Sequence, residues 1–232
     1  MILSVQEELE ATIEQLKALA IPANVSGMAR FGINPNNTLG VSMPKIRQLG
    51  KRKKDHALAL ALWGTGIHEA RILASIIDQP ALVTSQQMDS WTADFDSWDV
   101  CDQVCSNLYS KSPFAVEKAL SWSQSGQEFV KRAGFALMAY IAVHGKKIDD
   151  SVFIQFLETI ETSADDGRNF VKKAVNWALR QIGKRGAPFY QPALEVSRRL
   201  AESTNKTARW IGMDALKELE APSTTIRKRI GI

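Results

Sequence analysis

The sequence predicts an all-α protein, and three observations support this prediction. Apolar residues recur every three or four positions, the spacing of one helix face, as Val5, Leu9, Ile13 and Leu16 show in the first segment. No stretch keeps the alternation of apolar and polar residues that a half-buried strand requires. Only a few residues, with caps, glycines or prolines among them, separate one helical segment from the next. Helices joined in this way pack as antiparallel neighbours.

Start and stop signals give the bounds of each expected helix. After the first helix, the stretch 21–37 reads as a loop. A strongly basic helix, 42–54, begins with Ser42 as its cap and carries Lys45 and Arg47. Further helices are expected at 55–63, 67–77, 85–94, 97–109, 113–125, 128–144, 149–160, 166–182, 188–201 and 205–220, followed by a basic tail. We expect one domain, 1–232, folded as an α–α superhelix (solenoid) of HEAT-like helical repeats.

Composition limits the classes of function. The chain has 232 residues, 45% of them hydrophobic, which is enough for a folded core. Its net charge of +4 is mildly basic, so the choice of partner depends on where the cations cluster. The first residues are acidic and helical, without a basic region or a long apolar run, so neither export nor membrane insertion is expected. We expect a cytoplasmic monomer that does not bind membranes.

The two cysteines, Cys101 and Cys105, lie four residues apart in one expected helix. A disulfide between such neighbours would be strained, and only His56, His68 and His144 could complement them as metal ligands. Packing inside the helical array is therefore the favoured interpretation. No metal or cofactor is expected.

The helix expected at 97–109 carries the first candidate site. At about 100° per residue, Trp98 and Asp102 lie on one stripe with Cys105 and Tyr109. The apolar residues well round from this stripe are Val100, Val104 and Leu108. Trp98 and Asp102 thus share a face that is not the apolar one, and Asp102 lies too far into the helix for a capping role.

Neighbouring acids have ordinary structural explanations. Ser97 can cap the start of the helix, and Asp96 and Asp99 lie near the positive end of its dipole. Paired acids such as Asp149 and Asp150 could indicate a metal-dependent nuclease. They lie beside an expected helix start, however, where capping is the better explanation.

The segment 166–184 carries a second candidate surface. Lys173, Trp177, Arg180 and Lys184 follow the spacing i, i+4, i+7 and i+11, so they form one narrow stripe. The apolar face half a turn away consists of Val171, Val175, Ala178 and Ile182. Cations suit a phosphate backbone, and an indole ring suits a sugar or base. Packing of Trp177 on a neighbouring repeat is the alternative.

Arg132, in the helix expected at 128–144, is a further candidate cation. It shares a face with Ala136 and Ala139, which leaves room for another molecule to approach closely. The same small residues also permit close helix packing, with Arg132 in a structural ion pair. Both interpretations stay open at this point.

Three motifs, taken in order, resemble the AlkD family of bacterial DNA alkylation repair glycosylases, and the likeness runs from about Met28 to Arg209. The motifs are Ser97-Trp98-Asp99-x-x-Asp102, Lys131-Arg132-Ala133 and Phe170-Val171-Lys172-Lys173-Ala174-x-x-Trp177-x-Leu179-Arg180. The fold that this family implies is a superhelix of HEAT-like repeats with a concave, positively charged DNA surface. It agrees with the architecture expected from the helix pattern.

The resemblance implies a role for each matching residue. Asp102 matches the family's catalytic aspartate, and Trp98 and Trp177 match the two tryptophans that flank the lesion. Arg132 and Arg180 match arginines near the DNA backbone.

Two positions depart from the pattern of a known relative. Phe31 stands where that relative has a tyrosine, and Ser97 replaces a second tryptophan. We expect Phe31, Lys45 and Arg47 to contact DNA together with the stripe in 166–184.

The implied reaction is hydrolysis of the N-glycosidic bond of a cationic alkylated purine, N3-alkyladenine or N7-alkylguanine, in double-stranded DNA. Such a base is already a good leaving group, so a carboxylate needs only to stabilise the developing positive charge on deoxyribose and orient water. No lysine is well placed for Schiff-base chemistry, which predicts a monofunctional glycosylase.

Two other classes of function compete with the enzyme. One is a non-catalytic relative that binds distorted or branched DNA, and the other is a helical-repeat scaffold for proteins. The presence of Trp98, Asp102 and Trp177 together favours the enzyme. A steep loss of affinity with added salt would exclude the scaffold.

Overall fold

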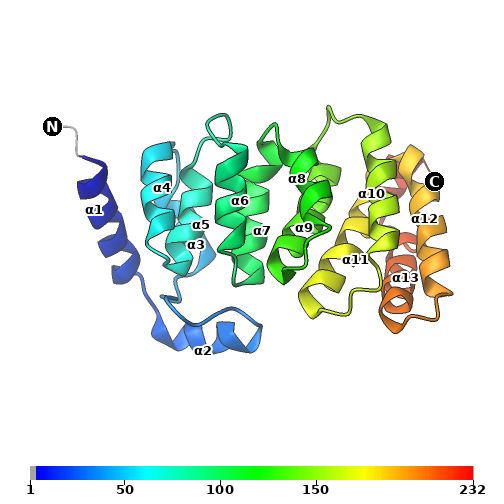
Figure 1. Ribbon diagram of the computed structural model, residues 1–232, viewed down its shortest axis with the longest axis horizontal. Helices are drawn as coiled ribbons and strands as arrows, with labels where there is room; N and C mark the ends of the chain where they lie inside the picture. The colour runs from blue at the N-terminus through cyan, green and yellow to red at the C-terminus, as the bar shows by residue number, and fades with distance from the viewer. Residues whose placement is uncertain (1–3, 232) are drawn as a thin grey trace. The chain divides into compact units, whose positions relative to one another are not determined.

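The computed structural model describes residues 4–231, and these confirm the all-α prediction. They form fourteen α-helices, one short 3₁₀-helix and no β-strand (Figure 1). Contacts between helices divide the chain into two compact units, Met1–Pro113 and Phe114–Ile232. Within each unit, helices pack mainly against helices close to them in the sequence, as in helical repeats.

The first unit contains seven of the α-helices and the 3₁₀-helix. Their bounds are α1 Val5–Ala18, α2 Pro22–Arg30, α3 Met43–Leu49, α4 His56–Gly64, α5 His68–Ile77, α6 Ser85–Ala93, α7 Trp98–Asn107 and the 3₁₀-helix Tyr109–Lys111. α4 packs against α5 and α5 against α7, while α1 and α3 cover this group. Figure 1 shows α2 lying crosswise at one end of the unit.

Aromatic rings and thiols fill much of the core of the first unit. Trp63 of α4 stacks on Trp91 of α6, with ring centroids 4.1 Å apart. The Trp63 indole N–H donates to Asp94 at 2.9 Å, so its polar group is satisfied. Cys101 and Cys105 of α7 form no disulfide bond, and both side chains are fully buried. The packing interpretation of the cysteines is therefore confirmed.

The second unit contains the other seven α-helices. Their bounds are α8 Ala115–Trp122, α9 Glu128–His144, α10 Asp150–Thr162, α11 Asn169–Gly183, α12 Ala187–Ala201, α13 Lys206–Leu219 and α14 Thr224–Ile230. α9 packs against α8 and α11, and α13 packs against α11 and α12. The long helices α9, α11 and α13 thus lie next to one another in this unit.

Two glycines allow close approach within helix pairs of the second unit. A Cβ added to Gly134 of α9 would lie 2.5 Å from the backbone nitrogen of Ser123, just after α8. A Cβ added to Gly212 of α13 would lie 2.6 Å from the backbone oxygen of Ser197 in α12. Both distances are too short for real contacts, so any side chain would push the paired helices apart.

Two helices lie where the sequence predicts a loop and a tail. α2 begins with Pro22 in its first turn, but none of its residues is buried. α14 forms within the basic tail, and Ile230 is its one buried residue in the described chain. A helix that buries so little surface leaves no apolar periodicity by which it could be predicted.

Two further bounds differ from the prediction for local reasons. α3 ends before Gly50 rather than at residue 54, because the chain turns there and Arg52 adopts a positive φ of 63°. α11 begins after Arg168 rather than at Asp166. The Asp166 carboxylate binds the Arg168 guanidinium at 2.6 Å and does not cap the helix.

Candidate nucleic-acid interface

The first candidate residues lie at the start of α7. Trp98 is the first residue of the helix and Asp102 follows one turn later, and both side chains are half-buried. The helix ends at Asn107, before the predicted end at residue 109, and Cys105 and Tyr109 are fully buried. Only the N-terminal half of the predicted stripe therefore reaches the surface.

A cavity of about 590 Å³ opens beside Trp98, within the first unit. Its lining includes Met28 of α2 and Phe31, whose side chain is 74% exposed. α7 contributes Asp99 and Gln103 in addition to Trp98. Asp99 is thus the α7 carboxylate in the lining. A mostly apolar cavity with a few polar groups suits a flat organic ring.

Hydrogen bonds from α7 hold one wall of this cavity. The Trp98 indole N–H donates to the carbonyl oxygen of Phe31 at 3.0 Å. Ser97 occupies the N-cap position but, contrary to the prediction, makes no cap, because its Oγ accepts the backbone N–H of Asn34 at 2.9 Å. The Asn34 side chain in turn donates to Asp96 at 2.6 Å. The segment 31–34 is thereby fixed against α7.

Glu69 of α5 fixes residues 39–41, which follow the segment 31–34 in the chain. Its side chain has no exposed surface, and its carboxylate accepts the backbone N–H groups of Leu39, Gly40 and Val41 at 2.9, 2.7 and 3.1 Å. A buried carboxylate is stable only when its oxygens are hydrogen-bonded, and these three bonds meet that need. Gly40 and Val41 also line the cavity, so Glu69 supports its shape.

Asp99 is paired with a buried histidine. His68 Nε2 lies 2.9 Å from Asp99 Oδ2, and the histidine is only 5% exposed. Burial lowers the pKa of His68, but the hydrogen bond and the charge of Asp99 outweigh it, so the pKa lies above its ordinary value. The sequence places Asp99 near the positive end of the helix dipole but does not indicate this partner, which lies 31 residues away.

The basic helix α3 borders the same region. Lys45 and Arg47 are exposed, whereas Ile46 between them is buried and anchors the helix. Arg47 Nη2 lies 3.5 Å from the side-chain oxygen of Gln103, which lines the cavity. Two candidate DNA contacts therefore lie on the surface of the unit that carries Trp98.

In the second unit, the predicted core face of α11 is confirmed. Val171, Val175, Ala178 and Ile182 are all fully buried. On the opposite face, Lys173 is exposed and Trp177 is half-buried. The Trp177 ring meets Tyr140 of α9 edge-on, with centroids 5.0 Å apart. Trp177 thus packs on a neighbouring helix and keeps part of its surface accessible.

Glu218 of α13 neutralises part of the α11 stripe. Arg180 and Lys184 both form ion pairs with this carboxylate. Burial raises the pKa of Glu218, but the bond from Lys184 and the charges of both cations outweigh it, and the pKa lies below its ordinary value. One carboxylate therefore holds two of the cations that the sequence assigns to DNA.

Arg132 is buried, with 6% of its surface exposed. Its Nη1 donates to the carbonyl oxygen of Phe170 at 2.7 Å, which ties α9 to the first turn of α11. Next to it, Lys131 pairs with Asp166 at 3.1 Å. These contacts give Arg132 a structural function within the second unit, and its contact with DNA stays a prediction.

The predicted site residues form two groups. Phe31, Lys45, Arg47, Trp98 and Asp102 belong to the first unit, and Arg132, Lys173, Trp177, Arg180 and Lys184 belong to the second. Among residues 4–231, no group of three or more His, Cys, Asp or Glu side chains is arranged to hold a metal ion. No helix in that range is long and apolar enough to span a membrane.

The helix pairs, the aromatic cavity and the basic helix face define a HEAT-like helical-repeat protein. A solved structure described as "a new family of proteins related to the HEAT-like repeat DNA glycosylases with affinity for branched DNA structures" is similar, with a TM-score of 0.78. The alignment covers 97% of this chain and 96% of that chain at 22% sequence identity. This likeness confirms the fold predicted from the sequence.

The sequence also matches a family. Residues 12–219 match the sequence model of the DNA alkylation repair enzyme family, and the chain therefore belongs to that family. The chain matches none of the curated proteins with which it was compared. The resemblance indicated by the three sequence motifs is thus confirmed at the level of the family.

Proposed function

We propose that this protein is a monofunctional DNA glycosylase. Its substrates are cationic alkylated purines, N3-alkyladenine and N7-alkylguanine, in double-stranded DNA, and it acts as a monomer in the cytoplasm. Membership of the DNA alkylation repair enzyme family supports the reaction class. The observation that carries the proposal is the cavity beside Trp98, with Asp99 in its lining and Asp102 one turn along the same helix.

The reaction requires mainly that the protein place a negative charge close to the sugar. An alkylated purine cation leaves the sugar as a neutral base, and water adds to the anomeric carbon and loses a proton. Positive charge develops on the deoxyribose as the bond breaks. The Asp102 carboxylate stabilises this charge and accepts the proton from water. No cofactor takes part.

The two tryptophans supply aromatic surface for the cationic sugar or base. Each cation–π contact contributes about 0.5–2 kcal/mol, depending on how far the cation is desolvated. Trp98 is held in place by its bond to the Phe31 carbonyl, and Trp177 is held by Tyr140. Rings fixed in this way lose little conformational entropy when a substrate binds.

Cations on both units supply contacts to the phosphate backbone. These cations are Lys45 and Arg47 on the first unit and Lys173 on the second. All three side chains are exposed, so a phosphate can reach them. Arg180 and Lys184 contribute less, because Glu218 pairs with both and Asp214 lies 4.0 Å from Arg180. These contacts bind DNA without regard to sequence and make its affinity depend on salt.

The test compares release of free base from methylated duplex DNA by wild type, Asp102→Asn and Asp99→Asn. We expect wild type to release N3-methyladenine and N7-methylguanine. Asp102→Asn should be slower by about 100-fold or more, the usual effect of removing one preorganised electrostatic group, and should still bind DNA. Equal release by wild type and Asp102→Asn would contradict this assignment. A larger loss in Asp99→Asn would move the catalytic function to Asp99.

A second candidate function is non-catalytic binding of distorted or branched DNA. The structure that is similar over 97% of this chain belongs to proteins described as having that affinity. The two functions differ in a simple measurement. Tight binding of a four-way junction, with no base released from methylated DNA by wild type, would establish the second function in place of the first.

A further inference from the structure

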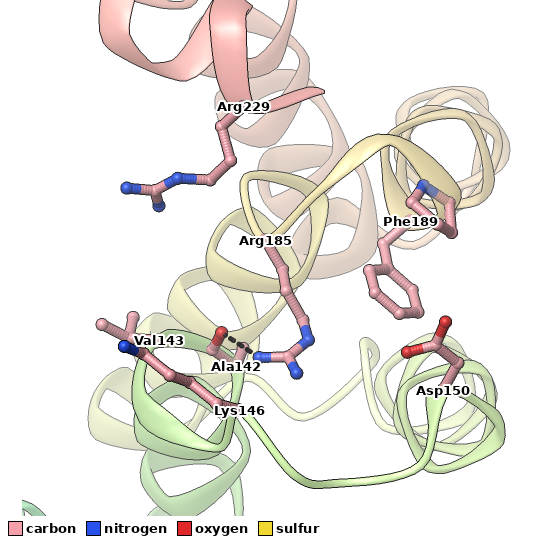
Figure 2. A pocket seen from close by; sticks show the side chains of 8 residues that line it. Ala142, Val143, Lys146, Asp150, Arg185, Phe189 and Arg229 are labelled. Atoms are coloured by element: carbon pink, nitrogen blue, oxygen red, sulfur yellow. Dashed lines mark hydrogen bonds between the residues drawn. The ribbon is translucent and has the colours of Figure 1, made fainter. Parts of the chain in front are cut away.

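A second cavity of about 590 Å³ lies within the second unit. Its lining comes from the end of α9, the start of α10, the segment after α11, the start of α12 and α14 (Figure 2). None of its lining residues belongs to the α11 stripe or to the cavity beside Trp98. The proposed glycosylase chemistry therefore leaves this cavity without a function.

Arg185 is fixed in position within this cavity. Its Nη1 donates to the carbonyl oxygen of Ala142 at 2.9 Å, and its Nη2 donates to that of Gly145 at 2.8 Å. Its guanidinium lies over the Phe153 ring, 4.0 Å from the ring centre. These bonds use two of the five N–H groups of the guanidinium. A guanidinium held in this way is preorganised to bind an anion through the others.

Two more cations reach the cavity from separate elements. Lys146 follows α9, and Arg229 lies on α14. Figure 2 shows their head groups on the same side of the cavity, with Arg185 between them and Asp150. Within residues 4–231, no carboxylate lies within 4.0 Å of the charged groups of these three cations. Three cations and one carboxylate give the cavity a net positive charge.

The position of Arg229 is set by its neighbour. Ile230 is only 3% exposed and anchors α14, which packs against α12. Docking of this apolar residue brings Arg229 to the rim of the cavity. The basic segment at the end of the chain is therefore not simply a solvated run of charge.

The rest of the lining is apolar. Pro188 is exposed and forms one part together with Phe189, of which only 4% is exposed, and Val143, which is 46% exposed, forms another. An apolar wall beside a cationic cluster suits a phosphate that carries an organic group. The pKa of Arg185 lies below its ordinary value, because burial outweighs the charge of Asp150, and the guanidinium has therefore lost part of its hydration.

The geometry points to a nucleotide-phosphate site in which Lys146, Arg185 and Arg229 bind one phosphate group and the apolar wall receives the attached nucleoside. The nucleotide can belong to a DNA strand or be free in solution, because the recognised chemistry is the same. This site does not depend on the proposed glycosylase activity, since binding to it requires no lesion.

The test uses two double variants with the same change in charge. Lys146→Ala/Arg229→Ala removes two exposed cations that line the cavity. Lys147→Ala/Lys228→Ala removes two exposed cations from the same two segments that do not line it. Binding of undamaged duplex DNA is measured by fluorescence anisotropy over a range of salt concentrations. Binding of deoxyadenosine monophosphate is measured by calorimetry, and thermal melting checks that both variants are folded.

We expect the cavity variant to bind duplex DNA about tenfold more weakly, which corresponds to about 1.4 kcal/mol. The slope of log K against log salt should fall by about 1, because one phosphate contact is lost. The control should keep wild-type values. A loss confined to the mononucleotide would identify free nucleotide as the ligand. Equal losses in both variants, or no loss with either probe, would overturn the proposal. Base release from methylated DNA is a separate measurement, so failure of the glycosylase proposal would leave this result intact.

Discussion

Removing the Glu69 carboxylate should loosen the wall of the cavity beside Trp98. One of its oxygens accepts the fully buried N–H groups of Gly40 and Val41, and the other accepts the part-buried N–H of Leu39. Glu69→Ala leaves these donors without their acceptor. A buried donor without a partner costs about 1–3 kcal/mol, so the two fully buried groups alone predict a loss of roughly 2–6 kcal/mol. That is a large part of the total stability of most proteins.

Glu69→Gln gives a finer test of the same reasoning. If the amide oxygen takes the place of Oε1, the bonds to Gly40 and Val41 remain and only the bond to Leu39 is lost. The expected cost is then about 1–3 kcal/mol. The control is Glu10→Gln, since Glu10 is an exposed glutamate of α1, and it should change stability by less than about 0.5 kcal/mol.

Two measurements follow these variants. Urea unfolding gives the free energies of unfolding, which should fall in the order wild type, Glu69→Gln, Glu69→Ala. Hydrogen exchange of the backbone amides of Leu39, Gly40 and Val41 reports on the cavity wall itself, and all three should exchange faster in Glu69→Ala. An alanine variant within about 0.5 kcal/mol of wild type, with unchanged exchange at these amides, would refute the reasoning.

Two further predictions concern charged pairs. The folded-state pKa of His68 lies above its unfolded value, so its pair with Asp99 stabilises the fold fully below about pH 6.5 and loses that contribution as the pH rises through the folded-state pKa. Unfolding midpoints in urea across this range should fall less in His68→Gln than in wild type, and identical pH profiles would contradict the prediction. Glu218→Gln should free the charge of Lys184 and leave Arg180 with only its 4.0 Å pair to Asp214, so DNA should bind more tightly and its salt slope should steepen by about 1, as salt-dependent anisotropy would show. An unchanged slope would mean that these two cations do not face DNA.

The sequence by itself determined the helical fold and the faces of its strongest helix. The apolar stripe of α11, which runs from Val171 to Ile182, is buried as its spacing predicts. The cysteines of α7 pack in the core as expected. Such patterns are local, because a helix places residues three and four positions apart on the same face. The sequence of one helix is therefore enough to show which face is buried.

Sequence patterns predict a helix less well where the helix buries little surface. α2 and α14 bury almost nothing, so no stripe indicated either helix. Ser97 carried a cap signal, yet its hydroxyl binds Asn34, 63 residues away. A short polar side chain can satisfy a distant backbone group as readily as its own helix, and the sequence does not distinguish these outcomes.

Only the tertiary structure decided which charges are available. Glu69, His68 and Glu218 find their partners 28 to 38 residues away, in other parts of the chain. The spacing of Arg180 and Lys184 was predictable, but the Glu218 carboxylate that pairs with both of them lies on another helix, α13. The sequence determined the face on which each side chain lies. Contacts between helices determined whether that side chain meets solvent or a partner, because ion pairing and burial depend on distances in space, which local periodicity does not encode.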